Sequence, residues 1–291
     1  MRSSDLPSTG RASAHADALV SQLTDRPASQ PVGTVTLVGA GPGDPELLTL
    51  KAARALEQAR LVLYDHLVSP AVLDFLPAGA ERLYVGKEAS RHTLPQADIA
   101  RLMVQLARAG HSLVRLKGGD GYIFGRGGEE VQALAAAGIP FQVIPGLTAA
   151  QGAAASTGIP LTHRDHAGAL VLATGHRRAD RQLDMDWTML ARPRQTVVLY
   201  MGVSNLPEIC RQLLAHGLPA STPAALIENA TLPKERCVTG TLAQLPDLAR
   251  QHRICPPALI MIGNVIAARQ QPNGIRPPCL RRQTSGMSGP G

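Results

Sequence analysis

The sequence predicts an α/β protein of two domains with a small-molecule cleft. Short apolar strands alternate with helical segments through most of the 291 residues, and clusters of glycine come directly after several strands. Alternating strands and helices form parallel sheets with crossover helices, and such sheets bind ligands beyond the carboxyl ends of their strands. Because glycine lets backbone amides approach a ligand closely, the clusters indicate one small-molecule cleft.

The first domain is expected at residues 32–150. Its strands are predicted at five short runs, namely 34–38, 61–64, 83–85, 112–116 and 141–144. Helical patterns lie between them at about 46–59, 69–76, 95–109 and 129–137. The first helix has the clearest start. Asp44 is a favoured N-cap residue, Pro45 suits the first helical position, and Glu46 favours the positive end of the helix dipole.

The second domain is expected at residues 166–269, after an interdomain segment at 151–165. The small residues of Thr148–Gly158 predict a tightly packed helix that leads into this segment. Further strands are predicted at 169–173, 196–201, 223–227, 236–239 and 258–263, with helices near 204–216 and 241–252. The polar, proline-containing segments at 1–31 and 270–291 are predicted to be disordered.

Composition narrows the class of protein. Hydrophobic residues make up 44% of the chain and charged residues 18%, as in ordinary globular proteins. Only 3% are aromatic, which argues against a nucleic-acid surface on which bases stack. The four cysteines form no C-x-x-C pair, which favours a reduced, cytoplasmic protein. No apolar run is long enough to span a membrane, and no signal-peptide core is present, so no membrane association is expected. The net charge of +7 suits an acidic ligand or serves solubility alone.

The first glycine cluster, Gly39–Gly43, resembles the start of a dinucleotide-binding fingerprint, and Asp65 follows the next strand where a ribose-binding acid would lie. Asp44, however, replaces the third glycine of that fingerprint. A carboxylate at the helix start would repel a pyrophosphate. An adenosyl ligand with a sulfonium cation and no phosphate fits this loop better. A glycine turn that binds no ligand is the alternative.

Two further glycine loops follow each other closely. Lys117–Gly121 places two glycines and an acid after a strand, and the alternative there is an ordinary tight turn. Arg126–Glu130 adds an arginine, two glycines and two acids at a helix start. Arg126 suits a bidentate contact with a ligand carboxylate. Alternatively it forms a surface ion pair with Glu129 or Glu130.

Three more positions carry candidate functional groups. Thr162–His166 contains two histidines, but no third metal ligand stands out, so no metal site is expected and Arg164 is interpreted as a carboxylate anchor. Lys87 is another charge at a strand end. Met201 ends the strand at 196–201, where core packing alone would explain a methionine.

The order of these motifs resembles that of the tetrapyrrole methylases over about residues 33–268. Eight segments carry the resemblance: Val38–Asp44, Tyr64–Val68, Val85–Lys87, Arg115–Asp120, Phe124–Glu130, Pro145–Ala149, Gly158–Arg164 and Tyr200–Gly202. The resemblance implies two α/β domains that hold S-adenosylmethionine between them, in a homodimer and without a metal. It also implies two successive C-methylations of uroporphyrinogen III to precorrin-2, for sirohaem, cobalamin or d-type haem synthesis.

The resemblance further implies which residues act. Asp65 and Lys87 match the family's proposed acid/base pair, whereas in relatives of d-type haem synthesis the residue matching Arg126 is the proposed proton acceptor. Both assignments stay open. The residues matching Glu129 and Arg164 hold the substrate. Contacts with the methyl donor fall on Pro42, Gly118, Gly119, Asp120, Ile123, Thr148, Ala149, Met201 and Ala230.

Two positions depart from the family pattern, since Gly121 stands where proline is usual and Ala230 where glycine is common. Three other functions are the alternatives. A related methylase would act on a later corrinoid or on the diphthamide precursor of a protein. A nicotinamide oxidoreductase is disfavoured by Asp44. A non-catalytic ligand-binding protein is disfavoured by the presence of Asp65, Lys87 and Arg126.

Overall fold

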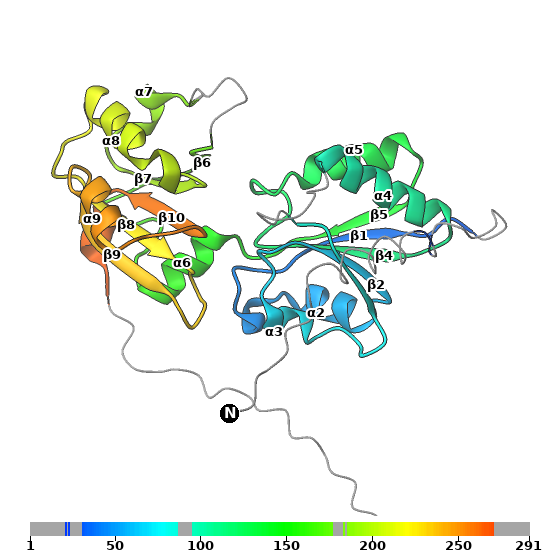
Figure 1. Cartoon of the computed structure of the whole chain (residues 1–291). Coiled ribbons are helices and arrows are strands. Elements are labelled where there is room, and N and C mark those ends of the chain that lie inside the picture. Colours follow the sequence, from blue (N-terminus) through cyan, green and yellow to red (C-terminus); the bar gives the residue numbers. More distant parts are fainter. Residues whose placement is uncertain are drawn as a thin grey trace, which may run out of the picture.

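The computed structural model of the chain describes residues 31–86, 95–176, 183 and 185–270, together with Ser21 and Leu23. Two five-stranded sheets form an N-terminal and a C-terminal lobe, and the chain crosses between them where β5 leads into α6 (Figure 1). The predicted α/β class is therefore confirmed, while the bounds of the predicted domains stay a prediction. The segments predicted to be disordered, 1–31 and 270–291, lie almost wholly outside the described residues.

The N-terminal sheet is parallel throughout. Its strands are β1 (Val35–Gly39), β2 (Leu61–Tyr64), β3 (Glu81–Tyr84), β4 (Leu113–Lys117) and β5 (Phe141–Ile144), in the spatial order β3-β2-β4-β1-β5. The central strands β1 and β4 are buried at every position. Strands covered on both faces are expected to read as continuous apolar runs, as these largely do.

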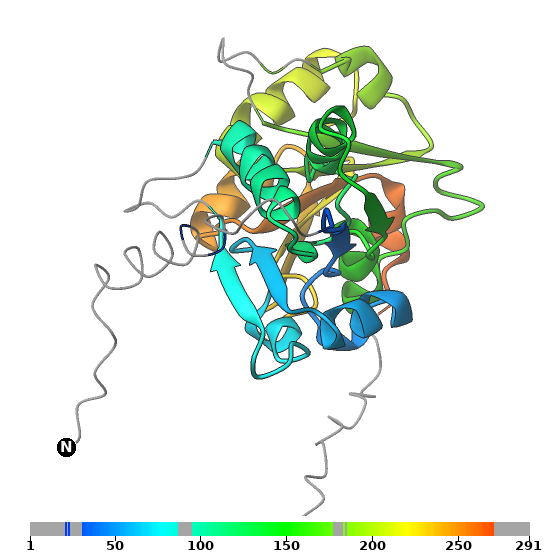
Figure 2. The ribbon, with the colours of Figure 1, turned by 90° about the vertical axis from the view of Figure 1, so that its right-hand side faces the viewer.

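Helices cover both faces of this sheet (Figures 1 and 2). The short helices α2 (Leu50–Glu57) and α3 (Pro70–Leu73) pack on one face, and α4 (Gln96–Arg108) and α5 (Gly127–Ala136) on the other. Successive side chains of a strand point to opposite faces. Leu37 of β1 accordingly belongs to the core under α4 and α5, whereas Val38 belongs to the core over α2 and α3.

The predicted first helix, 46–59, is wrong in its start. Asp44 caps only a short 3-10 turn, Pro45–Leu47, in which its Oδ1 accepts from the amide of Glu46 at 2.9 Å. Leu48 and Thr49 are extended, and α2 begins after Thr49, whose hydroxyl accepts from the amide of Ala52 at 3.1 Å. Thr49 is a second favourable N-cap, so the chain starts a new helix there instead of continuing the first.

The C-terminal sheet is mixed. Its strands are β6 (Ala169–Thr174), β7 (Gln195–Tyr200), β8 (Pro223–Glu228), β9 (Arg236–Thr241) and β10 (Ala258–Ile262), in the order β6-β7-β10-β8-β9. Only β6 and β7 are parallel, and the other three pairings are antiparallel. All five strands lie where the sequence predicts them.

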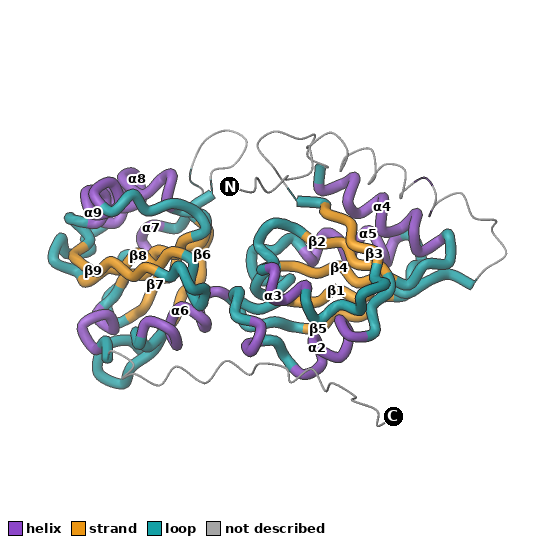
Figure 3. The backbone as a smooth tube through the Cα atoms, turned by 60° about the horizontal axis from the view of Figure 1, so that its bottom comes forward, coloured by secondary structure: helices purple, strands orange, loops and turns teal. Residues whose placement is uncertain are grey.

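Helices flank the second sheet on both sides (Figure 3). One side holds α7 (Trp187–Leu190), α8 (Leu206–Ala215) and α9 (Leu245–Gln251), and the other holds α6 (Ala149–Thr157) with the 3-10 turn η3 (Asn264–Ala268). A second 3-10 turn, η2 (Val203–Asn205), precedes α8. Both α7 and η3 are absent from the sequence prediction. No helix in the described part of the chain is long and apolar enough to cross a membrane.

The site position follows from the strand order. The neighbours β1 and β4 send their crossover helices to opposite faces, α2 to one and α5 to the other. Such a switch point opens a crevice at the carboxyl ends of the strands. Gly41 and Gly119, just beyond β1 and β4, exchange backbone hydrogen bonds of 3.1 and 2.7 Å there. The two predicted glycine loops therefore meet.

Glycine is required where the backbones are closest. A Cβ atom on Gly39 would lie 2.4 Å from the amide nitrogen of Gly146, in the loop after β5. We therefore expect Gly39→Ala to lower the free energy of unfolding by about 1–3 kcal/mol through overpacking. A matched control is Gly79→Ala, because a Cβ there meets nothing within 4 Å. Urea unfolding of both variants checks this, and equal stability of the two would contradict it.

Candidate active site

Asp120 joins the loops that follow β4 and β5. Its Oδ2 accepts from the amide of Gly146 at 3.0 Å, and its Oδ1 accepts from the amide of Tyr122 at 2.9 Å. Gly118 packs against Leu67, since a Cβ on Gly118 would lie 2.6 Å from Leu67 Cβ. The segment at 117–121 is thus fixed at the carboxyl end of the sheet by contacts on both of its sides. An ordinary surface turn does not require such contacts.

A cavity of about 390 Å³ lies where the two lobes meet. Its lining combines the polar side chains Asp120, Thr148 and Gln151 with three leucines, Leu161, Leu170 and Leu172. Its volume suits a small molecule, and an apolar wall with a few polar groups is typical of ligand pockets. Ile123 also lines the cavity, so three of the nine predicted donor contacts, Asp120, Ile123 and Thr148, lie together here.

Tyr200 ties the end of β7 to the start of α6 beside this cavity, and its ring also contacts the N-terminal lobe. Its hydroxyl lies 2.6 Å from the Thr148 Oγ1 and accepts from the amide of Ala150 at 3.0 Å, at the start of α6. Its ring packs on Phe124 with a centroid distance of 4.9 Å. Burial raises the pKa of Tyr200, so the phenol stays protonated at neutral pH and keeps this contact.

The remaining donor positions lie on loops that pack across the same junction. Pro42 packs on α6, where a Cβ on Gly152 would lie 2.5 Å from Pro42 Cγ. The amide of Asp44 donates to the Thr231 hydroxyl at 3.2 Å, and Thr231 follows Ala230. Ala149 is the first residue of α6. The segments around Pro42, Ala149 and Ala230 therefore pack together at this junction.

Residues with a left-handed backbone conformation cluster at this junction. Seven non-glycine residues in the described part of the chain have positive φ, and five of them follow strands at this edge: Phe124, Arg126, Met201, Asn229 and Thr231. Each costs on the order of 1 kcal/mol or more, and such strain is typical of functional sites. Met201 is 50% exposed, so core packing does not explain it. The sequence gives no sign of this strain.

Asp65 belongs to a charge cluster beneath the site. The outer guanidinium nitrogen of Arg115 lies 3.2 Å from Asp65 Oδ2, and Arg115 Nε lies 3.2 Å from Glu130 Oε1. Lys117 Nζ lies 3.1 Å from the same Glu130 oxygen. Burial, and then the neighbouring Arg115, lower the pKa of Lys117. Sequence reasoning missed these partners, although two cations at alternate positions of a strand must share one face.

Arg126 and Glu129 lie above this cluster on the exposed rim. They form a bidentate pair with N–O distances of 2.8 and 2.7 Å, and each side chain is 54% exposed. The surface ion pair that was one alternative for Arg126 is therefore present, with Glu129 and not with the buried Glu130. The hydrogen bond to Glu129 raises the pKa of Arg126. An exposed pair of this kind is weak and can exchange partners with a ligand.

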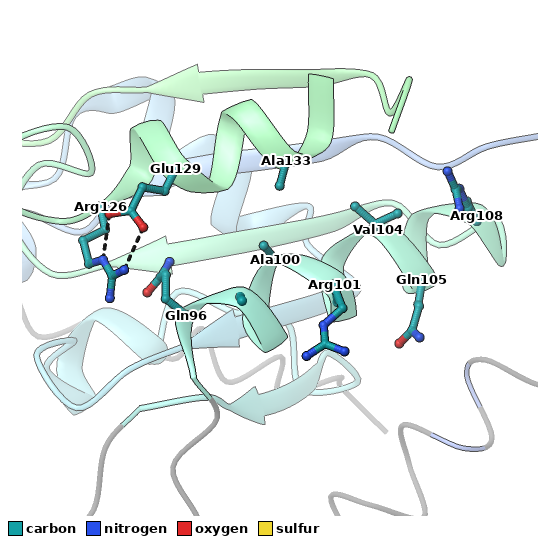
Figure 4. Close-up of a pocket in the computed structure, with 10 residues that line it drawn as sticks. Gln96, Ala100, Arg101, Val104, Gln105, Arg108, Arg126, Glu129 and Ala133 are labelled. Atoms are coloured by element: carbon teal, nitrogen blue, oxygen red, sulfur yellow. Dashed lines mark hydrogen bonds and ion pairs between the residues drawn. The ribbon is translucent and has the colours of Figure 1, made fainter. Parts of the chain in front are cut away.

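A groove of about 560 Å³ runs from this pair between α4 and α5. Figure 4 shows Arg126 and Glu129 at one end, with Arg101 and Arg108 further along α4. The floor between them is made of small apolar residues, among them Ala100 and Ala133. The groove thus combines an apolar floor with arginines at its edges.

Two predicted residues stand apart from these contacts. Lys87 lies outside the described residues. Arg164 lies in the exposed turn before β6, where its carbonyl accepts from Arg194 at 3.1 Å, and within the described part no ion pair joins it to Arg126 or Glu129. The His163 and His166 rings are 4.7 Å apart, but no group of three or more potential metal ligands forms among the described residues.

The architecture defines a class of small-molecule enzyme with a cleft between two α/β lobes, and comparison with known families makes the class specific. The sequence model described as "Tetrapyrrole (Corrin/Porphyrin) Methylases" matches residues 34–246. The chain belongs to the tetrapyrrole methylase family.

Individual relatives agree with this membership. The siroheme synthase of Nitrosomonas europaea is 53% identical over 262 residues, which are 90% of this chain and 55% of that protein. The chain thus spans about half the length of the curated relatives it matches. Native uroporphyrin III C-methyltransferase from Thermus thermophilus is 41% identical with a TM-score of 0.70, and the match covers 81% of this chain and 94% of that one. The Thermus thermophilus enzyme complexed with S-adenosylhomocysteine is 42% identical, with the same TM-score and coverage.

The Tyr200 contact makes a testable contribution to stability. Tyr200→Phe leaves the buried amide of Ala150 without its acceptor, and an unmade buried hydrogen bond costs about 1–3 kcal/mol. We expect a loss of that size in the free energy of unfolding, measured by urea denaturation. The control is Tyr122→Phe, because Tyr122 is 54% exposed. Equal stability of the two variants would show that the Tyr200 hydroxyl does not stabilise the start of α6.

Proposed function

We propose that this chain is an S-adenosylmethionine-dependent C-methyltransferase that methylates uroporphyrinogen III twice to give precorrin-2. The observation that carries the proposal is 41–42% identity over 94% of the Thermus thermophilus enzyme, which is a uroporphyrin-III C-methyltransferase. One of those structures holds S-adenosylhomocysteine, the demethylated form of the donor. The curated relatives are siroheme synthases, which supports sirohaem as the end product.

The residues at the lobe junction fit the methyl donor. The donor combines an adenine, a ribose and a charged amino-acid end, so it needs a pocket with an apolar side and a polar side. Leu170 and Leu172 would pack against the base, while Asp120 and Thr148 are the polar groups available to the rest. The glycines at 39, 119 and 146 leave backbone at the cavity edge without side chains. When bound, S-adenosylmethionine supplies an activated methyl group.

The rim residues suit the other substrate. Uroporphyrinogen III carries eight carboxylates on a reduced macrocycle whose ring carbon is the nucleophile. Arg126 presents a half-exposed guanidinium at one end of the α4–α5 groove, and a guanidinium binds a carboxylate bidentately. Arg164 and the arginines of the α4–α5 groove would hold further carboxylates. The cleft must also align the two reacting centres and exclude water.

Each methyl transfer releases a proton from the macrocycle, and Asp65 is the better acceptor for it. A guanidinium stays charged at ordinary pH, and the pair with Glu129 raises the pKa of Arg126 further. Asp65 is a carboxylate, is 20% exposed at the end of β2, and is held by Arg115. We assign proton removal to Asp65, binding of the substrate carboxylates to Arg126 and Arg164, a further substrate contact to Glu129, and the role of acid partner to Lys87. We also propose that the enzyme acts as a cytoplasmic homodimer.

The proposed function is tested by incubating the protein with S-adenosylmethionine and uroporphyrinogen III without oxygen, and by analysing the products by mass and absorbance. The expected product carries two added methyl groups. If S-adenosylhomocysteine binds but no methyl is transferred, the substrate is a different tetrapyrrole. Failure to bind S-adenosylhomocysteine would refute the proposal.

Two substitutions separate the proposed roles in this assay. Asp65→Asn removes the proton acceptor, so kcat is expected to fall by about 10²–10⁴-fold. Arg126→Gln removes a carboxylate contact, so KM for uroporphyrinogen III is expected to rise about tenfold with less change in kcat. The controls are Asp74→Asn and Arg250→Gln, exposed residues outside the site. A larger effect of Arg126→Gln on kcat than on KM would instead favour Arg126 as proton acceptor.

A further inference from the structure

Four charged side chains gather near the loop at 117–121, and only one of them is partly exposed to solvent. The side chains of Arg115, Lys117 and Glu130 are 3%, 5% and 0% exposed, whereas that of Asp65 is 20% exposed. With both carboxyl groups ionised and both basic groups protonated, the cluster has no net charge. Such clusters are costly to break, because removing one partner leaves a buried charge uncompensated.

Glu130 is the centre of this cluster. Its Oε1 accepts from Arg115 Nε at 3.2 Å, from Lys117 Nζ at 3.1 Å and from Gln96 Nε2 at 2.9 Å. Its Oε2 is buried without a hydrogen-bond partner among the described residues. A carboxylate with one oxygen shared by three donors and the other unpaired is not placed for stability alone, because an unmade buried hydrogen bond is costly.

The glycines at the start of α5 bring Glu130 into this position. A Cβ on Gly127 would lie 2.5 Å from the carbonyl oxygen of Gly121, so only glycine lets the helix begin against that loop. Glu130 lies one turn later, facing β4. Its neighbour Glu129 is 54% exposed and pairs with Arg126 on the rim. The adjacent glutamates therefore make different contacts, Glu129 on the exposed rim and Glu130 in the buried cluster.

Arg115 links Glu130 to Asp65. Its Nε contacts Glu130, its Nη2 contacts Asp65 Oδ2 at 3.2 Å, and its Nη1 donates to the carbonyl of Leu116 at 2.9 Å. A planar guanidinium with all three nitrogens engaged has one orientation. Asp65 Oδ1 also accepts from the amide of Leu67 at 3.2 Å, so both carboxylate oxygens are held.

We propose that Glu130 is a positioning residue for Asp65, acting through Arg115 and balancing the charge of Lys117. This inference rests on the proposed function, in which Asp65 accepts the proton. Glu130 keeps the guanidinium in place and cancels one of the two positive charges beside Asp65. Without that cancellation, the excess positive charge would stabilise the Asp65 carboxylate and make it a weaker base.

The charged groups that face Asp65 come from two elements. Arg115 and Lys117 lie on β4 and Glu130 lies on α5, while α4 contributes the neutral Gln96. His66 follows Asp65 in the chain, and the phenols of Tyr64 and Tyr84 end β2 and β3 with their rings 5.5 Å apart. Lys87 lies outside the described residues. Glu130 and Lys117 are thus the two groups whose charges can be removed without substituting Asp65 or its bound partner Arg115.

The test removes these two charges separately and together. Glu130→Gln leaves an extra positive charge, so the pKa of Asp65 should fall and the acidic limb of the kcat–pH profile should move to lower pH. Lys117→Met leaves an extra negative charge and should move both in the opposite direction. The double variant restores neutrality and should return both toward wild type. We expect kcat of Glu130→Gln to fall about tenfold. The KM values for both substrates should stay within about twofold of the wild-type values, since the Glu130 side chain is buried.

A readout that needs no substrate and a second pair of variants keep the test independent of the substrate assignment and of folding losses. The Asp65 titration is followed by NMR of ¹³C-labelled aspartate, assigned with Asp65→Asn, and needs no substrate. Glu57→Gln, an exposed glutamate on α2, is the control. If Glu130→Gln fails to fold, Lys117→Met and the neutral double variant still give the comparison. An Asp65 pKa that is unchanged in every folded variant would overturn the proposal. Absence of methylation by the wild-type protein would refute the proposed function, while the NMR shifts would still measure the effect of Glu130 on Asp65.

Discussion

The contact among three glycine backbones at the end of the first sheet is the constraint on which the rest of the molecule depends. Gly39 ends β1, and Gly119 and Gly146 follow β4 and β5. A Cβ on Gly39 would lie 2.4 Å from the amide nitrogen of Gly146, and one on Gly146 would lie 2.4 Å from the carbonyl oxygen of Gly119. Asp120 then fixes the loop after β5 through the amide of Gly146. That loop leads within three residues into α6, which packs against the second sheet. The position of the second lobe, and of the cavity between the lobes, follows from this sequence of contacts.

The charged side chains at the site are of two kinds. Those on the exposed rim can change ion-pair partners, and those in the interior cannot. Arg126 and Glu129 are half-exposed, and screening by water makes their pair weak enough to yield to a carboxylate ligand. Arg115 and Glu130 are buried, so the same kind of pair there has no alternative partner from solvent. Two adjacent glutamates at one helix start thus differ because one faces the solvent and the other faces β4. A substrate with many carboxylates requires exposed ion pairs that can exchange partners. A proton acceptor with a fixed orientation requires buried pairs that cannot.

Much of the fold could be predicted from the sequence, because short apolar runs bounded by glycine and polar residues leave little choice of strand. All ten strands lie within two residues of their predicted bounds. The start of the first helix was wrong because Asp44 and Thr49 are both good caps and the sequence does not say which one begins the longer helix. Asp120, Ile123 and Thr148 were expected near one another only through the family resemblance, and they line one cavity. Leu170, Leu172 and the partners of Asp65 could not, since only the packing of one lobe on the other, and of α5 on β4, brings them to the site.

The central claim is that the methyl donor binds in the cavity between the lobes. A crystal structure of the chain with S-adenosylhomocysteine tests this claim most directly, because it shows where the ligand binds. A donor site at the junction of the lobes predicts one ligand per chain, lying between the glycine loops of the first sheet and the leucines of β6, within contact of Asp120 and Thr148. A ligand bound elsewhere on the chain, with this cavity unchanged, would contradict the assignment of the site while leaving the family membership intact.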